Sequence, residues 1–161
     1  MSDYKKKITD ISILGFGDIS SAFLAALFWF ILAAISHQSQ YGEITYIISI
    51  STLLSTVSLL GASNVITVFE AKKYNLSFLY LCSIILSLIC GIISSIILKN
   101  FTIILLPLGF VLFQLVTSKI LGTKNYRKLT YFVISQKLIL LITGLIFFKI
   151  FGINEIGRAH V

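Results

Sequence analysis

The sequence predicts an all-α integral membrane protein of about five transmembrane helices. Of its 161 residues, 57% are hydrophobic and 12% are charged, against roughly 45–50% and 25% in ordinary soluble domains. Three charge-free runs, Ile19 to Gln40, Ile44 to Phe69 and Tyr74 to Leu98, each exceed the ~20 residues that cross ~30 Å of hydrocarbon as a helix. A soluble domain of this length could not cover so much apolar surface.

The expected spans follow from these apolar runs and the polar segments between them. We expect them at residues 16–36, 44–69, 76–98, 101–120 and 129–151. Residues 1–15 place isoleucines at helical spacing among lysines, which is typical of an amphipathic helix at the membrane interface. The apolar stretch that follows is too long for the h-region of a cleavable signal peptide. Pro107 is the candidate hinge, because proline inside a helix kinks or unwinds it.

Basic residues divide unequally between the two sides of this topology. The N-terminal segment, the loop after the second span and residues 119–128 contain nine, whereas the other side has Lys99 and Lys149. The positive-inside rule then predicts a multi-pass protein of the cell membrane with a cytoplasmic N-terminus. The net charge of +7 does not point to nucleic acid, because these bases lie in short clusters between spans rather than on a soluble face.

The last residues have the character of a foreign tail. Residues 156–161, Ile-Gly-Arg-Ala-His-Val, back-translate as ATC GGA AGA GCA CAC GTC, the start of a widely used sequencing adapter. We therefore expect residues 155–161 to be non-native and the remainder of the same chain to be missing after Asn154. The alternative is a genuine polar C-terminal tail.

Small and hydroxylated residues form stripes along two spans. In the second span one stripe comprises Thr45, Ser49, Thr52, Thr56, Ser63 and Thr67, and a neighbouring one comprises Ser51, Ser55, Ser58 and Ala62. The third span has Ser83, Ser87, Gly91 and Ser95 at four-residue spacing. Such residues mediate helix packing in lipid, and they also suit a hydrated cavity between helices. Both interpretations remain open, and both can hold for different residues of one stripe.

A few polar side chains exceed what packing requires. Lys137 in the fifth span is the candidate phosphate contact, since a compact ammonium binds an anionic headgroup; the alternative is a lysine that snorkels to the interface. Asp18 is either an exposed interfacial carboxylate or a cavity group. Asn64, Gln114 and Gln136 either line the same cavity or form hydrogen bonds between helices.

No catalytic set is recognisable, so we expect no enzyme and no cofactor. His37 lacks partners at metal-ligand spacing, and no Gly-x-Ser-x-Gly elbow is present. Cys82 and Cys90 lie within one apolar run, which favours a packing role over a disulfide.

Three short segments carry a family resemblance. They resemble the N-terminal part of polysaccharide-export flippases. The segments are Trp29 in the first span, Tyr41-Gly42 with the Glu43-Ile44-Thr45-Tyr46 that follows, and Leu59-Leu60-Gly61. These are O-antigen or lipid-linked oligosaccharide translocases of the multidrug/oligosaccharidyl-lipid/polysaccharide exporter superfamily. The resemblance spans residues 11–154 and implies the first part of an N-terminal bundle of a larger exporter.

The resemblance also implies a function. Family members move lipid-linked sugars across the membrane by alternating access, and cationic side chains in the cavity hold the lipid phosphate. Lys137 is the position here that could match, and the partners would be membrane lipid and a lipid-linked sugar as cargo. Two alternatives stay open: a multidrug-type cation antiporter, which would favour carboxylates in the spans, and a small non-transporting membrane subunit or scaffold.

Overall fold

The computed structural model describes the backbone of residues 2–98 and 104–147 and the side chains of residues 8–96 and 104–146. Within these ranges the chain forms six helices and no strands, and five helices are long and apolar enough to cross a membrane. This confirms the all-α membrane fold class. The expected adapter-derived tail, Lys99 and Lys149 lie outside the described residues.

The helices follow one another with short connections. Their bounds are α1 Ser2–Ile35, α2 Gln38–Leu59, α3 Ala62–Ala71, α4 Ser77–Leu98, α5 Leu105–Gly122 and α6 Tyr126–Phe147. α3 has 10 residues, about half of what a membrane crossing needs. The chain divides into two compact units, one formed by Met1–Gln38 with Tyr126–Val161 and the other by Ser39–Asn125.

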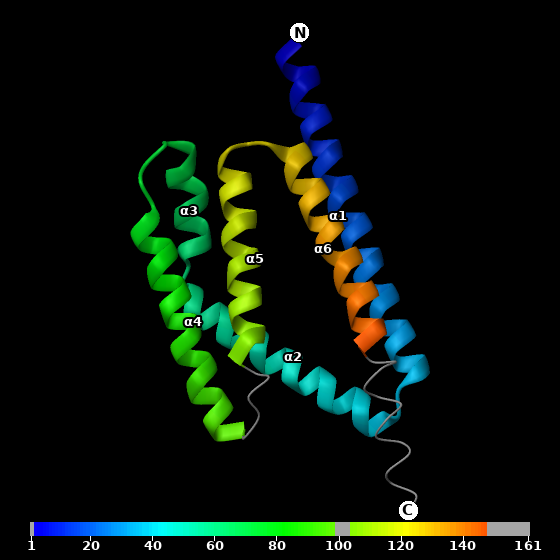
Figure 1. Ribbon diagram of the computed structural model, residues 1–161. Coiled ribbons are helices and arrows are strands. Elements are labelled where there is room, and N and C mark those ends of the chain that lie inside the picture. The colour runs from blue at the N-terminus through cyan, green and yellow to red at the C-terminus, as the bar shows by residue number, and fades with distance from the viewer. Residues whose placement is uncertain (1, 99–103, 148–161) are drawn as a thin grey trace, which may run out of the picture. The chain divides into compact units, whose positions relative to one another are not determined.

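In the first unit, α1 and α6 lie side by side and run in the same direction (Figure 1). Their contacts keep one register: a Cβ on Gly17 would lie 2.8 Å from the Thr130 side chain, and one on Gly144 would lie 2.8 Å from the Phe28 ring. Glycine lets the helices approach closely, as is usual in lipid. Three membrane crossings separate α1 from α6 in the chain. Because each crossing reverses the direction, the two helices are expected to be parallel.

The N-terminal part of α1 extends beyond the start of α6. The segment expected as a separate interfacial helix, residues 1–15, is continuous with the first span from Ser2 onward. No glycine or proline lies between Ser2 and Leu14 to interrupt the helix. At 1.5 Å per residue, the 34 residues of α1 extend about 50 Å, which exceeds the hydrocarbon thickness.

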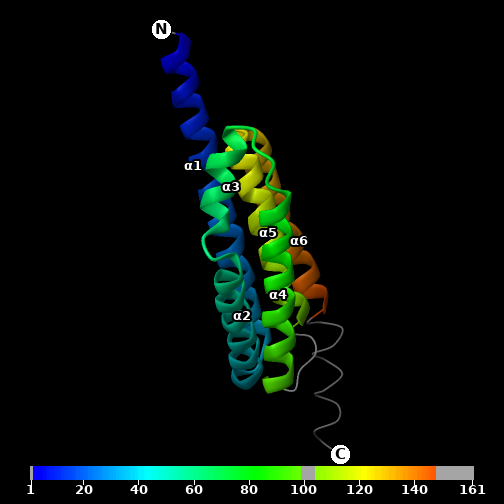
Figure 2. The ribbon, with the colours of Figure 1, turned by 90° about the vertical axis from the view of Figure 1, so that its left-hand side faces the viewer.

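In the second unit, α5 packs against both α3 and α4 (Figure 1 and Figure 2). The buried core of this unit consists of Ala62, Ile66, Leu76, Val111 and Leu115. α3 and α5 run in the same direction and are joined by a hydrogen bond from the Thr67 hydroxyl to the Ser118 carbonyl oxygen, 3.3 Å. α4 runs opposite to α5, and a Cβ on Gly91 would lie 3.0 Å from the Ile104 carbonyl oxygen. Small residues again set the interhelical distances.

The second expected span, residues 44–69, is two helices rather than one. The break falls at Leu60 (φ 44°) and Gly61 (φ 80°), which both adopt the left-handed conformation that ends helices. Gly61 tolerates this conformation without a steric penalty, whereas Leu60 does not. The Gly61 carbonyl oxygen then accepts from Asn64 N at 3.1 Å and starts α3. The Leu-Gly pair that resembles the flippase motif is therefore where the helix breaks.

Pro107 lies near the start of α5. It is buried and is the third residue of that helix, in its first turn. The first turn tolerates proline, because its backbone N–H groups have no partner within the helix. Residues 99–103 lie outside the described residues, so the hinge expected at Pro107 stays a prediction.

Candidate functional site

The structure separates the hydroxyl stripes into buried and exposed sets. The buried set consists of Ser51, Ser55, Ser58 and Ala62 on the second span, and Ser83, Ser87, Gly91 and Ser95 on the third. On α4, where Gly91 meets Ile104 of the α5 N-cap, these small residues allow close approach, which supports the packing interpretation for that stripe. Most hydroxyls of the buried set donate to the carbonyl oxygen one turn earlier, as Ser58 does to Leu54 at 2.7 Å.

The other stripe of the second span is exposed in part, because Thr45, Ser63 and Thr67 are partly buried. Ser49, Thr52 and Thr56 face away from the protein interior, and both threonine hydroxyls donate to backbone carbonyl oxygens at 2.8 and 2.9 Å. Their donors are satisfied within α2, while the oxygen lone pairs stay available to water or sugar hydroxyls. This polar face of α2 is therefore a candidate lining of a hydrated passage.

Lys137 lies well inside the described part of α6. It is the twelfth of 22 residues, so about 16 Å of helix separates it from Tyr126. A lysine stem is too short to bring its ammonium to that end by snorkelling. Its side chain is half-buried, and among the spans that the structure describes it is the only basic residue outside the terminal turns.

Gln136 and Asp18 belong to the same unit as Lys137 but stand in different environments. The Oε1 atom of Gln136 is buried and has no hydrogen-bond partner among the described residues. Asp18 is exposed, and it follows the Gly17 that packs on Thr130. It thus lies about two helical turns from the level of Lys137, and no ion pair joins the two in the described part of the chain.

Asn64 and Gln114 belong to the second unit. Both side chains are exposed, the first in the opening turn of α3 and the second midway along α5. Neither is part of the buried packing between α3, α4 and α5. An exposed amide at membrane depth requires a polar neighbour or water, since hydrocarbon offers no hydrogen bonds. Both residues remain candidates for lining a cavity.

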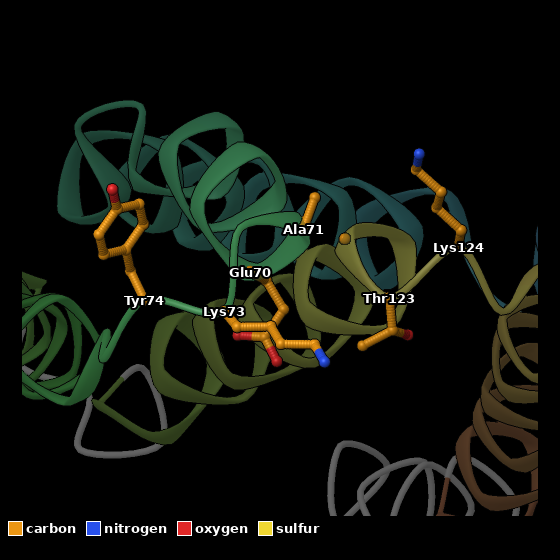
Figure 3. A pocket seen from close by; sticks show the side chains of 7 residues that line it. Glu70, Ala71, Lys73, Tyr74, Thr123 and Lys124 are labelled. Carbon is orange, nitrogen blue, oxygen red and sulfur yellow. The ribbon is translucent and has the colours of Figure 1, made fainter.

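A polar recess of about 570 Å³ opens where α3 and α5 end, and the sequence alone did not reveal it. Its lining residues are Glu70, Ala71, Lys73, Tyr74, Gly122, Thr123 and Lys124. Lys73 (φ 58°) and Lys124 (φ 56°) each end a helix in the left-handed conformation. In Figure 3 the Lys73 side chain runs across the recess toward Thr123, whereas Lys124 points away from it. The clustering of loop lysines after two parallel spans was the available signal.

The described residues contain no group of three or more His, Cys, Asp or Glu side chains that could hold a metal ion. Cys82 is exposed, Cys90 is partly buried and both are free thiols. The polar side chains described above are hydroxyls, amides, lysines and the carboxylates of Asp18 and Glu70.

The fold and these groups define an all-α integral membrane protein with polar side chains within its spans. No protein-family model matches the chain, and no curated protein or solved structure matches it significantly. The flippase resemblance consequently rests on the residues quoted for it, Trp29, Tyr41-Gly42 and Leu59-Leu60-Gly61.

Proposed function

We propose that this chain is part of a flippase that moves lipid-linked oligosaccharide or polysaccharide precursors across the cell membrane by alternating access. The observation that carries the proposal is the position of Lys137, about 16 Å along α6 from Tyr126. A charged side chain at the centre of a span costs about 3 kcal/mol on insertion scales. Such residues persist where they face a cavity or bind a ligand, and an ammonium suits the phosphate of a lipid-linked sugar.

The hydroxyl face of α2 supports the same function. A sugar chain needs a passage lined by hydrogen-bonding groups, whereas the lipid tail stays in hydrocarbon. The exposed Ser49, Thr52 and Thr56 offer oxygen acceptors without adding a charge. Asn64 and Gln114 extend the set of exposed polar side chains in the second unit.

Alternating access also requires segments that flex. The Leu60–Gly61 break between α2 and α3 supplies such a point, because helical hydrogen bonds are interrupted there. Interrupted helices near a substrate pathway are a recurrent feature of transporters. It is a second candidate hinge beside the one expected at Pro107.

The N-terminus is placed in the cytoplasm in this proposal. Within the first unit, the N-terminal ends of α1 and α6 point in the same direction, and α1 extends beyond the start of α6 (Figure 1). Within the second, the turns that carry Lys72, Lys73 and Lys124 lie at one end, where α3 and α5 finish. This grouping of basic residues is what the positive-inside rule expects of cytoplasmic ends.

The test uses the intact protein in proteoliposomes with a fluorescent isoprenyl-phosphate-linked sugar. Movement of the probe is followed by its protection from a membrane-impermeant quencher. Lys137→Gln should lower the initial rate at least about tenfold, the loss typical of one charge-assisted hydrogen bond. Lys137→Arg should retain most of the rate, and Lys119→Gln, an exposed basic residue in the last turn of α5, should match the parent.

Two results would contradict the proposal in different ways. Parent-like rates for Lys137→Gln, with equal yields of inserted protein, would remove Lys137 from the site. Failure of the parent protein to move the probe in an otherwise sealed vesicle would reject the flippase function itself.

A further inference from the structure

A groove of about 530 Å³ runs along the surface of the α1–α6 pair. It is lined by residues of both helices, among them Thr9, Ser12, Phe16, Arg127 and Ile134. Its volume falls in the ~300–1,000 Å³ range of small-molecule sites. Because α1 and α6 run in the same direction, the groove has a defined polarity along the membrane normal.

The two ends of the groove differ in chemistry. Arg127 is the second residue of α6, and the contact of Gly17 with Thr130 puts it level with Ile13 of α1, close to Ser12. Phe16 and Ile134 lie further along the helices, and seven residues, about 10 Å of helix, separate Arg127 from Ile134. The lining therefore combines a guanidinium and the Ser12 hydroxyl with apolar side chains further along the groove. A lipid with an anionic headgroup has the same division.

The Arg127 guanidinium is available to a ligand. Its side chain is exposed, and it forms no ion pair or hydrogen bond within the part of the chain that the structure describes. Arginine binds phosphate through parallel N–H donors, which fixes both position and orientation. Its location in the first turn of a span places it at headgroup level.

We propose that this groove binds one anionic glycerophospholipid, with its phosphate on Arg127 and one acyl chain against Phe16 and Ile134. The groove is open to the surrounding membrane, as the 67% exposure of Phe16 shows. Bulk phospholipid far exceeds any lipid-linked sugar in concentration, so mass action favours it as the occupant. The site is independent of Lys137 and of the proposed transport function.

Native mass spectrometry of the purified intact protein tests this site. Phosphatidylglycerol and phosphatidylcholine are added separately at matched mole fractions, and the retained lipid is counted. The parent should retain phosphatidylglycerol preferentially, and Arg127→Gln should reduce its retention about fivefold. Lys124→Gln removes a neighbouring basic residue that does not line the groove and should leave retention unchanged.

A second pair of variants tests the groove without altering charge. Ser12→Phe introduces a ring into the groove and should displace the bound lipid. Ser135→Phe places the same ring on an exposed position of α6 outside the groove and should have no effect. Equal melting temperatures for the two variants would exclude misfolding as the cause of a difference.

Three outcomes would overturn the assignment. Arg127→Gln could retain phosphatidylglycerol as the parent does, or Lys124→Gln could lose as much as Arg127→Gln, which would indicate unspecific attraction. Preferential retention of an isoprenyl phosphate over phosphatidylglycerol in a competition would assign the groove to the cargo lipid instead.

Discussion

The Thr130 hydroxyl on α6 donates a hydrogen bond to the Ile13 carbonyl oxygen on α1, with 3.1 Å between the two oxygens. The residues are 117 positions apart in sequence, and the bond lies one turn from the close approach at Gly17. A side-chain hydrogen bond across helices in lipid contributes about 0.6 kcal/mol on average. It therefore specifies register between α1 and α6 more than it supplies stability.

Replacing Gly17 tests the close approach directly. A Cβ there would lie 2.8 Å from Thr130 Oγ1 and 3.0 Å from its Cγ2, so Gly17→Ala should destabilise the pair by about 1–3 kcal/mol. Unfolding can be followed through the emission of Trp29, the single tryptophan. The expected result is a melting temperature lower by several degrees.

Gly15 provides the matched control for that variant. No atom lies within 4 Å of a Cβ built on it, and alanine is the better helix former by about 1 kcal/mol. Gly15→Ala should leave the melting temperature unchanged or raise it. A fall equal to that of Gly17→Ala would mean that the α1–α6 register is not the one described.

The fold class was predictable from the sequence because lipid imposes a strict rule on it. Backbone groups without water must be paired within a helix, so long charge-free runs such as Tyr74 to Leu98 leave one solution, and α4 occupies Ser77–Leu98. The division at Leu60 was not predictable in the same way. Glycine is common in spans, and the residues around Gly61 are apolar, so hydropathy could not distinguish a break from a packing position.

A second glycine tests the packing of α3 against α5. A Cβ on Gly122 would lie 2.8 Å from the Thr67 carbonyl oxygen and 2.7 Å from Glu70 Cβ. The backbone carbonyl cannot move independently, so Gly122→Ala should separate the two helix ends. The variant should be less stable by roughly 1–3 kcal/mol. Heating followed by size-exclusion chromatography should therefore show loss of the monodisperse peak at a lower temperature than in the parent.

Gly109 is the control on the same helix. It has no atom within 4 Å of a built Cβ, so Gly109→Ala should preserve the monodisperse peak at the parent temperature. Loss of the peak for both variants would show that α5 tolerates no added methyl group, and the specific contact with Thr67 would then not be responsible.

The break between α2 and α3 predicts effects of opposite sign at adjacent residues. Gly61 has φ 80° and Leu60 has φ 44°, and the left-handed region costs a side-chain-bearing residue about 1–2 kcal/mol. Gly61→Ala should therefore lower the melting temperature. Leu60→Gly should raise it or leave it unchanged, because the leucine side chain is 77% exposed and contributes little packing. Destabilisation by both variants would contradict the left-handed break.

The candidate site was less predictable than the fold. It depends on how deep each side chain lies along its helix and on which face of the helix carries it. The depth of Lys137 depends on where its helix begins: the expected span starts at residue 129, whereas α6 begins at Tyr126. Likewise, the serine stripe at Ser51 and the threonine stripe at Thr52 differ by one position. Their opposite burial follows from which face meets neighbouring helices, and tertiary packing alone decides that.

A double-mutant cycle at Gly17 and Thr130 separates crowding from the hydrogen bond. Thr130→Ala alone removes the bond to Ile13 and should cost about 0.6 kcal/mol. It also removes the Oγ1 and Cγ2 atoms that a Cβ on Gly17 would meet, so it should rescue Gly17→Ala. The cost of the double variant should then be smaller than the sum of the single costs, with a coupling energy of about 1 kcal/mol or more. Additive losses in the Trp29-monitored melting of the four proteins would show that the two residues do not contact each other.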